Sequence, residues 1–193
     1  MQTFEAISKR RSIRRFKQRK ISYAVLKNLV DCARVAPSAA NLQPLEYVVV
    51  NKKSTVDAIF PYLRWAGYLK EKGVPEEGRR PTAYIIVLVN KKKNAFPHYV
   101  QADMGAAIEN ILIAATSKGL GSCWIGAMDR TMIEKILRIP NGVSAEYTIA
   151  LGYSDESSSV ETMKRSHKYY KDRHARMHVP KRKLSQMLHY NRY

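Results

Sequence analysis

Apolar residues recur at helical spacing from residue 22 to residue 35. Ser22 is a suitable N-cap, because its hydroxyl can accept a hydrogen bond from an amide in the first turn, and Pro37 ends the pattern. The apolar positions between them are Leu26, Leu29, Val30 and Ala33. This spacing places one apolar stripe along a helix, so we predict a helix over residues 22–35.

A second helix is predicted over residues 99–118, where the sequence is apolar on nearly every face. A helix of this kind is buried on all sides, either in a core or at a subunit interface. Gly119 and Gly121 mark its end and a sharp turn. Shorter helical patterns begin at Phe4 and after Asp129, which is a second suitable N-cap.

Short runs rich in β-branched residues predict the strands. Residues 45–51 (LEYVVVN) and 83–90 (AYIIVLVN) are apolar over most of their length, as in largely buried strands. Residues 122–126 and 146–152 predict two further strands. Between the first two strands the pattern is less regular, and residues 61–80 are typical of a lid or an insertion.

Helices and strands therefore alternate, which favours a mixed sheet with helices on both faces. The expected fold class is α+β, with a mixed central β-sheet flanked by helices. Residues 1–153 form the core in this interpretation, and residues 154–193 form a C-terminal tail of the same domain. The tail closes with an apolar stripe at Leu184, Met187 and Leu188. This stripe predicts that the tail packs on its own core or on a partner subunit.

Positive charge is concentrated at both ends of the 193-residue chain, whose net charge is +18. Residues 1–20 carry eight Lys or Arg and one Glu, and residues 161–193 carry ten Lys or Arg and two acids. One alternative is a basic nucleic-acid-binding protein, in which Tyr169 and Tyr170 would stack on RNA bases. No RNP-type motif, zinc finger or clear helix-turn-helix accompanies the charge. The other readings are a solvated basic surface, or two ends that converge on one phosphate-bearing ligand.

An intracellular, cytoplasmic protein is expected. The longest apolar stretch, residues 102–115, contains Asp103 and Glu109 and is shorter than a membrane span. The N-terminus carries charges where a secretory signal needs a continuous apolar run. Cys32 and Cys123 are too few and too far apart for a zinc site, so two reduced, packed thiols are expected.

Three segments carry candidate binding chemistry. In Arg10–Phe16 (RRSIRRF), forked guanidinium donors and a hydroxyl suit a phosphate dianion, although a basic helix end without a ligand has the same composition. In residues 36–44 (APSAANLQP), Ser, Asn and Gln side chains can bind a heteroaromatic ring, or the segment is an ordinary loop. Residues 119–126 (GLGSCWIG) lack the GxGxxG spacing, but their glycines permit close backbone approach to a flat ligand.

Other candidate residues are less specific. Tyr62, Trp65 and Tyr68 either line a substrate pocket or serve packing, and Trp124 is expected in the core or at a dimer interface. His174 and His178 stand four residues apart, a spacing that suits a metal on one helix face. No third ligand accompanies these two histidines, so no metal site is predicted.

Taken together, the segments resemble the nitroreductase family of FMN-dependent oxidoreductases, in its short form. The matching runs are RRSIRRF from Arg10, APSAANLQP from Ala36, GAAIENILIAATSKGLG from Gly105, SCWIG from Ser122 and the closing VPKRKLSQMLHYNRY. They cover nearly the whole chain in the right order. The resemblance implies a homodimer with two FMN sites at its interface, and a tail that embraces the other subunit.

The resemblance also implies individual FMN contacts. The residues expected to bind the phosphate are Arg10, Ser12 and Arg14, with Arg182 or Lys183 from the tail. Arg11 is expected to contribute its backbone alone or to be structural. The residues expected to reach the isoalloxazine ring, usually from the partner subunit, are Pro37, Ser38 and Asn41. Gln43 is either structural or a ring contact.

Around the reactive edge of the ring, the match places the backbone N–H of Gly126 near flavin N5 and packs Ile125 on the ring face. Arg64 is a candidate for the pyrimidine edge. The flavin carries the chemistry, so no catalytic side chain is expected.

The implied reaction passes hydride from NADH or NADPH, through flavin N5, to a nitroaromatic, a quinone or a similar acceptor by a ping-pong mechanism. A specialised flavin enzyme, such as a dehalogenase or a flavin-fragmenting enzyme, is an alternative. A basic nucleic-acid-binding protein on a nitroreductase-like scaffold is the other. The sequence leaves the acceptor and the choice between NADH and NADPH open.

Overall fold

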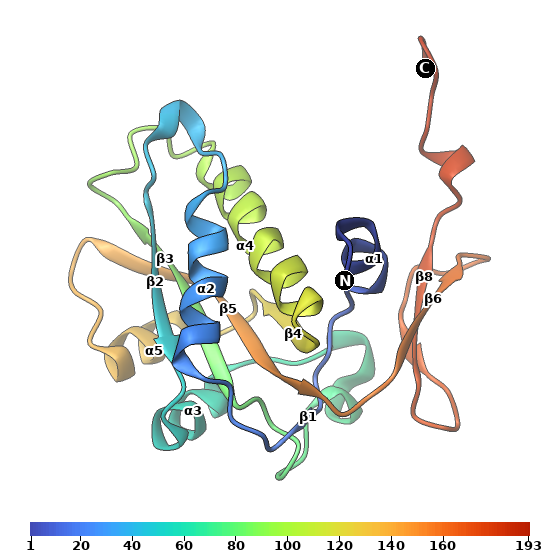
Figure 1. Cartoon of the computed structure of the whole chain (residues 1–193), viewed down its shortest axis with the longest axis horizontal. Helices are drawn as coiled ribbons and strands as arrows, with labels where there is room; N and C mark the ends of the chain where they lie inside the picture. Colours follow the sequence, from blue (N-terminus) through green and yellow to red (C-terminus); the bar gives the residue numbers. More distant parts are fainter.

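Strand β5 (Val143–Ser154) is the centre of the main sheet in the computed structural model, which describes residues 1–193 (Figure 1). It pairs antiparallel with β3 (Ala83–Asn90), β4 (Leu120–Ile125) and β1 (Phe16–Lys17). Strand β2 (Leu45–Val50) pairs antiparallel with β3. Ser122 of β4 also forms an isolated parallel bridge with Ser12, which is the one parallel contact of the main sheet. The main sheet is therefore mixed. The expected α+β fold with a mixed sheet is confirmed.

Helices cover both faces of this sheet, and β3 shows why. Its first seven residues are all buried, and alternate side chains enter two separate apolar cores, as the two-residue period of a strand requires. Ile85 lies in the first core and Tyr84 in the second. The helices of the first core are α2 (Tyr23–Arg34) and α4 (Val100–Ser117), and those of the second are α3 (Lys53–Ile59) and α5 (Arg130–Leu137).

Both predicted N-caps are confirmed. The Ser22 side chain accepts a hydrogen bond from the amide of Val25 at the start of α2. The Asp129 carboxylate accepts from the amide of Met132 at the start of α5, with an N···O distance of 3.0 Å. Gly119 has a φ of 73°, which lets the chain reverse after α4 and enter β4 directly.

The single chain leaves two apolar helix surfaces partly or fully exposed. Helix α4 is not buried on all sides within one chain, because the face that carries Gly105 and Ile113 is only partly covered. On α1 (Thr3–Lys9), Phe4 and Ile7 are exposed, the Phe4 side chain to 85%. None of the helices combines the length and the apolar character that crossing a bilayer requires.

The tail forms a small sheet of its own. Strand β8 (Met177–Lys181) pairs in parallel with β6 (Ser158–Thr162) and antiparallel with β7 (Tyr170–Lys171). In Figure 1 this sheet lies beside the core, and the last residues extend away from it. The terminal segment includes the short 3-10 helix η4 (Leu184–Gln186), and its apolar residues are exposed, Leu184 to 71%. Within one chain, the end of the tail therefore does not pack on the core.

His178 bridges the three strands of the tail sheet. Its Nδ1 lies 3.2 Å from Glu161 Oε2 on β6, and its Nε2 lies 3.1 Å from Asp172 Oδ2 just after β7. The ring of Tyr170 is stacked on its imidazole. The hydrogen bond to Asp172, with the neighbouring Glu161, raises the pKa of His178, and the same bond lowers the pKa of Asp172.

We expect the tail sheet to loosen as the pH rises. Protonated His178 stabilises the sheet fully below its ordinary pKa of about 6.5, and this contribution is lost as the pH passes the raised pKa. Amide hydrogen exchange of β8, corrected for its intrinsic pH dependence, should accelerate as the pH rises above about 6.5 and through the raised pKa of His178. His178→Gln should remove the pH dependence. His174→Gln, which changes an exposed histidine of the adjacent turn, should keep it.

Candidate functional site

The segment that follows α1 lies along strand β4. Ile13 donates its amide to the carbonyl of Ser122 over 2.8 Å, and Ser12 forms the parallel bridge to the same residue. The side chain of Ile13 lies against Gly121, where a Cβ atom would come within 2.8 Å of Ile13 Cγ2. Gly121 is therefore required for the close approach, which places Arg14 beside the end of β4.

A cavity of about 220 Å³ lies at this place, and we call it the Gly126 pocket. Its lining comes from β4 and the loop after it, from the start of the segment predicted as a lid, and from the tail. The lining residues are Arg14, Arg64, Trp65, Ala66, Gly67, Cys123, Trp124, Ile125, Gly126, Ala127 and Tyr169. The structure thus brings together Arg14, Ile125 and Gly126, which the sequence assigned to one cofactor.

The Gly126 pocket is rich in donors and has no carboxylate in its lining. Arg14 and Arg64 bring two positive charges. Arg14 Nε and Trp65 Nε1 are buried and have no hydrogen-bond partner in the protein. Leaving a buried donor unpaired costs about 1–3 kcal/mol, so these atoms fit a ligand that supplies acceptors. A planar, electron-rich group with a negative charge meets these requirements.

Cys123 contributes no nucleophile to this pocket. Burial raises the pKa of its thiol, and the nearby Arg14 guanidinium opposes that rise only in part. Both cysteines are free, with Cys123 buried and Cys32 half-buried. The chain also holds no group of three or more His, Cys, Asp or Glu side chains placed to bind a metal ion.

The second candidate segment, Pro37–Gln43, lines a separate cavity of about 350 Å³, which we call the Ser38 pocket. Three of its non-glycine residues have positive φ, namely Ala40, Asn41 and Gln43. The conformation is fixed by two hydrogen bonds of 3.0 Å, from the Ala39 amide to Asp103 Oδ1 and from the Gln43 amide to Ser38 Oγ. Unfavourable backbone of this kind persists where its surroundings hold it, often at binding sites.

The Ser38 pocket is lined by Pro37, Ser38 and Gln43, whereas Asn41 is exposed in the same loop and does not line it. No residue lines both this pocket and the Gly126 pocket. One chain therefore presents the two predicted ring-binding segments at separate places.

The residues predicted to bind a phosphate are also separated. Arg10 Nε lies 3.1 Å from Glu109 Oε1 on α4, and the Arg11 guanidinium donates to the carbonyl of Arg10. Arg182 and Lys183 are exposed in the tail after β8. Neither forms a hydrogen bond or an ion pair with residues 10–14.

The aromatic and histidine candidates also lie in different surroundings. Trp65 belongs to the second core and also lines the Gly126 pocket, whereas Tyr62 packs against that core and does not line the pocket. Trp124 is 37% exposed and also lines the pocket, so it does not lie in the core of the single chain, and its alternative place at a dimer interface stays a prediction. His174 and His178 lie in a turn and a strand, so they do not share a helix face. Tyr169 and Tyr170 have different neighbours, Arg14 for the first and His178 for the second.

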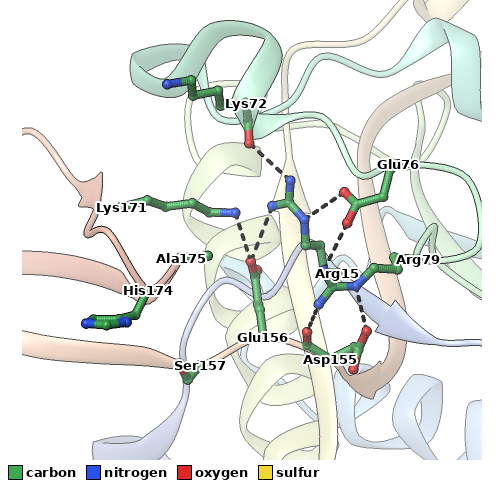
Figure 2. Close-up of a pocket in the computed structure, with 10 residues that line it drawn as sticks. All are labelled: Arg15, Lys72, Glu76, Arg79, Asp155, Glu156, Ser157, Lys171, His174 and Ala175. Atoms are coloured by element: carbon green, nitrogen blue, oxygen red, sulfur yellow. Dashed lines mark hydrogen bonds and ion pairs between the residues drawn. The ribbon is translucent and has the colours of Figure 1, made fainter.

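Sequence reasoning missed the residues that join the tail to the site. A larger cavity, of about 520 Å³, is lined by residues of the core and of the tail. Figure 2 shows that Arg15, one of these residues, interacts with Glu76 and with the carbonyl of Lys72. Glu156 lies at the same place with its side chain only 4% exposed, within 3.6 Å of Arg15 Nη1 and 3.5 Å of Lys171 Nζ. Its other oxygen accepts from the Arg14 amide over 2.6 Å. No local pattern marks Glu156, since its partners are far away in sequence.

Comparison with known proteins defines the class. Residues 7–153 match the model of the Nitroreductase family, so the chain belongs to the nitroreductase family of oxidoreductases. The "Putative NADH dehydrogenase/NAD(P)H nitroreductase" of Archaeoglobus fulgidus is 33% identical over 159 residues, which span 79% of this chain and 86% of the relative. The family assignment favours the enzyme over a basic nucleic-acid-binding protein.

Two further similarities concern cofactor and reaction. A solved structure of an FMN-dependent nitroreductase from Clostridium difficile R20291 is 25% identical, with a TM-score of 0.68 and coverage of 98% of this chain and 99% of that chain. The iodotyrosine deiodinase of Thermotoga neapolitana is 28% identical over 168 residues, which span 79% of this chain and 89% of the relative.

Proposed function

We propose that this protein is a cytoplasmic, homodimeric, FMN-dependent oxidoreductase that passes hydride from NADH or NADPH to a nitroaromatic, a quinone or a similar acceptor. The observation that carries the proposal is the Gly126 pocket, in which the buried Nε of Arg14 lacks a partner and no carboxylate opposes an anionic ring. The names of the similar proteins support FMN as the cofactor and a reduced nicotinamide as the donor.

The ring of FMN would lie in the Gly126 pocket. Ile125 would pack on one face, and the backbone N–H of Gly126 would point toward N5. An added Cβ atom at Gly126 would lie 3.0 Å from the Tyr147 ring, so Gly126 is already closely packed against Tyr147. Arg64, whose amide donates to the Ala127 carbonyl, would reach the pyrimidine edge.

The phosphate would bind the basic segment and the tail. Arg10, Ser12 and Arg14 would contribute from the segment beside β4, with Arg182 or Lys183 from the tail, and Arg11 would contribute its backbone alone or be structural. In one chain Arg10 is paired with Glu109, so phosphate binding would compete with that partly exposed ion pair. Ion pairs near the surface contribute little to the free energy of folding, so a phosphate could replace Glu109 as the partner of Arg10.

A second copy of the chain would complete each site. Because the Ser38 pocket and the Gly126 pocket share no residue, Pro37, Ser38, Asn41 and Gln43 would reach the ring of the partner's cofactor. The exposed apolar residues of α1 and of the tail end, together with the partly covered face of α4, would then become buried.

FMN, when bound, supplies the hydride-transfer chemistry at its N5 atom. Arg64, at the pyrimidine edge, would place positive charge where negative charge develops during the transfer. Trp65, Trp124 and Tyr169 surround the pocket with aromatic surface that restricts water. Donor and acceptor would occupy the same place in turn, which gives a ping-pong mechanism. No side chain need act as an acid or a base, in agreement with the neutral thiol of Cys123.

An absorbance spectrum of the purified protein from 300 to 550 nm tests the proposal. After reconstitution with FMN, we expect flavin bands that bleach anaerobically on addition of NADH or NADPH, and that return with menadione or a nitrofuran. Flavin bands that neither nucleotide bleaches would contradict the proposed donor. Failure to take up FMN at all would contradict the function.

Reductive dehalogenation is the second candidate, because the deiodinase of T. neapolitana matches most of this chain. It predicts that the reduced protein releases iodide from an iodotyrosine, measured with an iodide electrode. Turnover of nitro compounds and quinones without iodide release would favour the first candidate.

A further inference from the structure

A tyrosine of the tail forms one wall of the Gly126 pocket. Tyr169 precedes β7, is half-buried and lines the pocket together with Arg14. The centre of its ring lies 5.2 Å from the Cζ atom of Arg14. Such a guanidinium is attracted by the negative face of the ring.

Two contacts hold Tyr169 in this place. On one side its ring centre lies 5.1 Å from that of Tyr68, in the short 3-10 helix η3 (Gly67–Gly73), and its hydroxyl is 3.5 Å from the Tyr68 amide. The same Tyr68 has its hydroxyl 3.0 Å from His167 Nε2. On the other side, Lys171 is paired with the buried Glu156. These contacts hold residues 167–171 of the tail beside Arg14.

Glu156 and Tyr169 act on the same residue. The Glu156 carboxylate fixes the backbone of Arg14, and the Tyr169 ring restricts its side chain. An arginine has many rotamers, and ordering them has an entropic cost. A side chain that is already restricted loses less freedom when a ligand binds.

We propose that Tyr169 is a positioning residue, which holds the Arg14 guanidinium in the orientation that receives FMN. This inference rests on the proposed function, because it takes FMN as the ligand of the Gly126 pocket. It assigns to residues 167–171 of the tail a role within their own chain, in addition to any contact with a partner subunit.

Tyr170 provides a matched control. It is adjacent in sequence, but its ring is stacked on His178 with a centroid distance of 4.8 Å, and its hydroxyl bonds to Glu161. It therefore contacts the tail sheet and does not line the Gly126 pocket. Alanine at either position removes one tyrosine ring from the same segment.

FMN titration of the apoprotein tests the role, with flavin fluorescence as the signal. Tyr169→Ala should raise the Kd for FMN about three- to tenfold, as expected for a partly desolvated cation–π contact. Tyr169→Phe retains the ring and should stay within about twofold of the original protein. Tyr170→Ala should also leave the Kd nearly unchanged. An equal loss in Tyr170→Ala would overturn the proposal, because the effect would then come from loosening of the tail.

A double-mutant cycle distinguishes action through Arg14 from direct contact. If Tyr169 acts by holding Arg14, the double variant R14A/Y169A should bind FMN no more weakly than R14A. Additive losses would contradict positioning and indicate that Tyr169 touches the ligand itself.

A second readout does not involve FMN. In the ligand-free protein, the Nε–H resonance of Arg14, assigned with Arg14→Lys, should carry a ring-current shift that Tyr169→Ala removes and Tyr169→Phe retains. Loss of the shift in Tyr169→Ala would support the positioning even if the protein failed to take up FMN, an outcome that would contradict the proposed function alone. No change in the shift would overturn the positioning whatever the flavin chemistry.

Discussion

Arg14→Ala is expected to raise the Kd for FMN about 10- to 100-fold, the largest loss of binding for a single side chain of the site. Arg14 is the one predicted phosphate-binding residue that lines the Gly126 pocket, and its buried Nε has no partner in the protein. A hydrogen bond to a charged group contributes about 1.5–3 kcal/mol, which corresponds to this loss. Isothermal titration of the apoprotein with FMN measures it.

Two companion variants sharpen this result. Arg14→Lys keeps the charge but loses the planar fork of donors, so an intermediate Kd is expected. Arg19→Ala removes the same charge from an exposed arginine that lines neither pocket, and its Kd should remain within about twofold. If Arg19→Ala weakened FMN binding as much as Arg14→Ala, overall charge and not the pocket would explain the affinity.

Replacing Glu156 by alanine is expected to be the most destabilising substitution at the junction of core and tail. Its side chain is 4% exposed and faces Arg15 and Lys171, which are themselves only 13% and 16% exposed. Burial lowers the pKa of Lys171, and the Glu156 carboxylate opposes this shift. Removing the Glu156 carboxylate leaves Lys171 without an ion-pair partner, whereas Arg15 keeps Glu76. Breaking a buried ion pair by removing one partner costs about 3–5 kcal/mol. For a chain of this size, Tm should fall by about 6–20 °C.

Thermal and urea denaturation at one fixed protein concentration measure this loss, since association would otherwise shift the midpoint. Glu156→Gln keeps an acceptor for the Arg14 amide without the charge, and should lie between the original protein and Glu156→Ala. Glu76→Gln is the matched control, because Glu76 binds the same Arg15 but is 47% exposed, so its loss should stay below about 1 kcal/mol. Equal losses at the two positions would show that the burial of Glu156 has no special importance.

The structure also accounts for part of the excess positive charge at the chain ends. Arg15 and Lys171 serve the cluster around Glu156, and Arg10 pairs with Glu109. These cations stabilise contacts between distant segments, so their presence does not by itself require a nucleic-acid partner.

The sequence by itself determined the local elements and the class of the protein. Ser22 and Asp129 cap their helices because a capping hydrogen bond joins neighbouring residues, and the first seven residues of β3 are apolar because both faces of the strand are covered. The run from Arg10 and the SCWIG segment carried the resemblance to the nitroreductase family, which the match over residues 7–153 confirms.

Only the tertiary structure decided which of these residues meet. The approach of Ile13 to Gly121 places Arg14 at the end of β4, and the tail returns Tyr169 and Glu156 to the same residue. It also placed the Ser38 loop in a pocket apart from Gly126. Strand β7 of the tail went unpredicted because it has two residues, too few to show a period. Periodicity and capping are local, whereas contacts across more than 100 residues depend on strand register and packing, which no short pattern records.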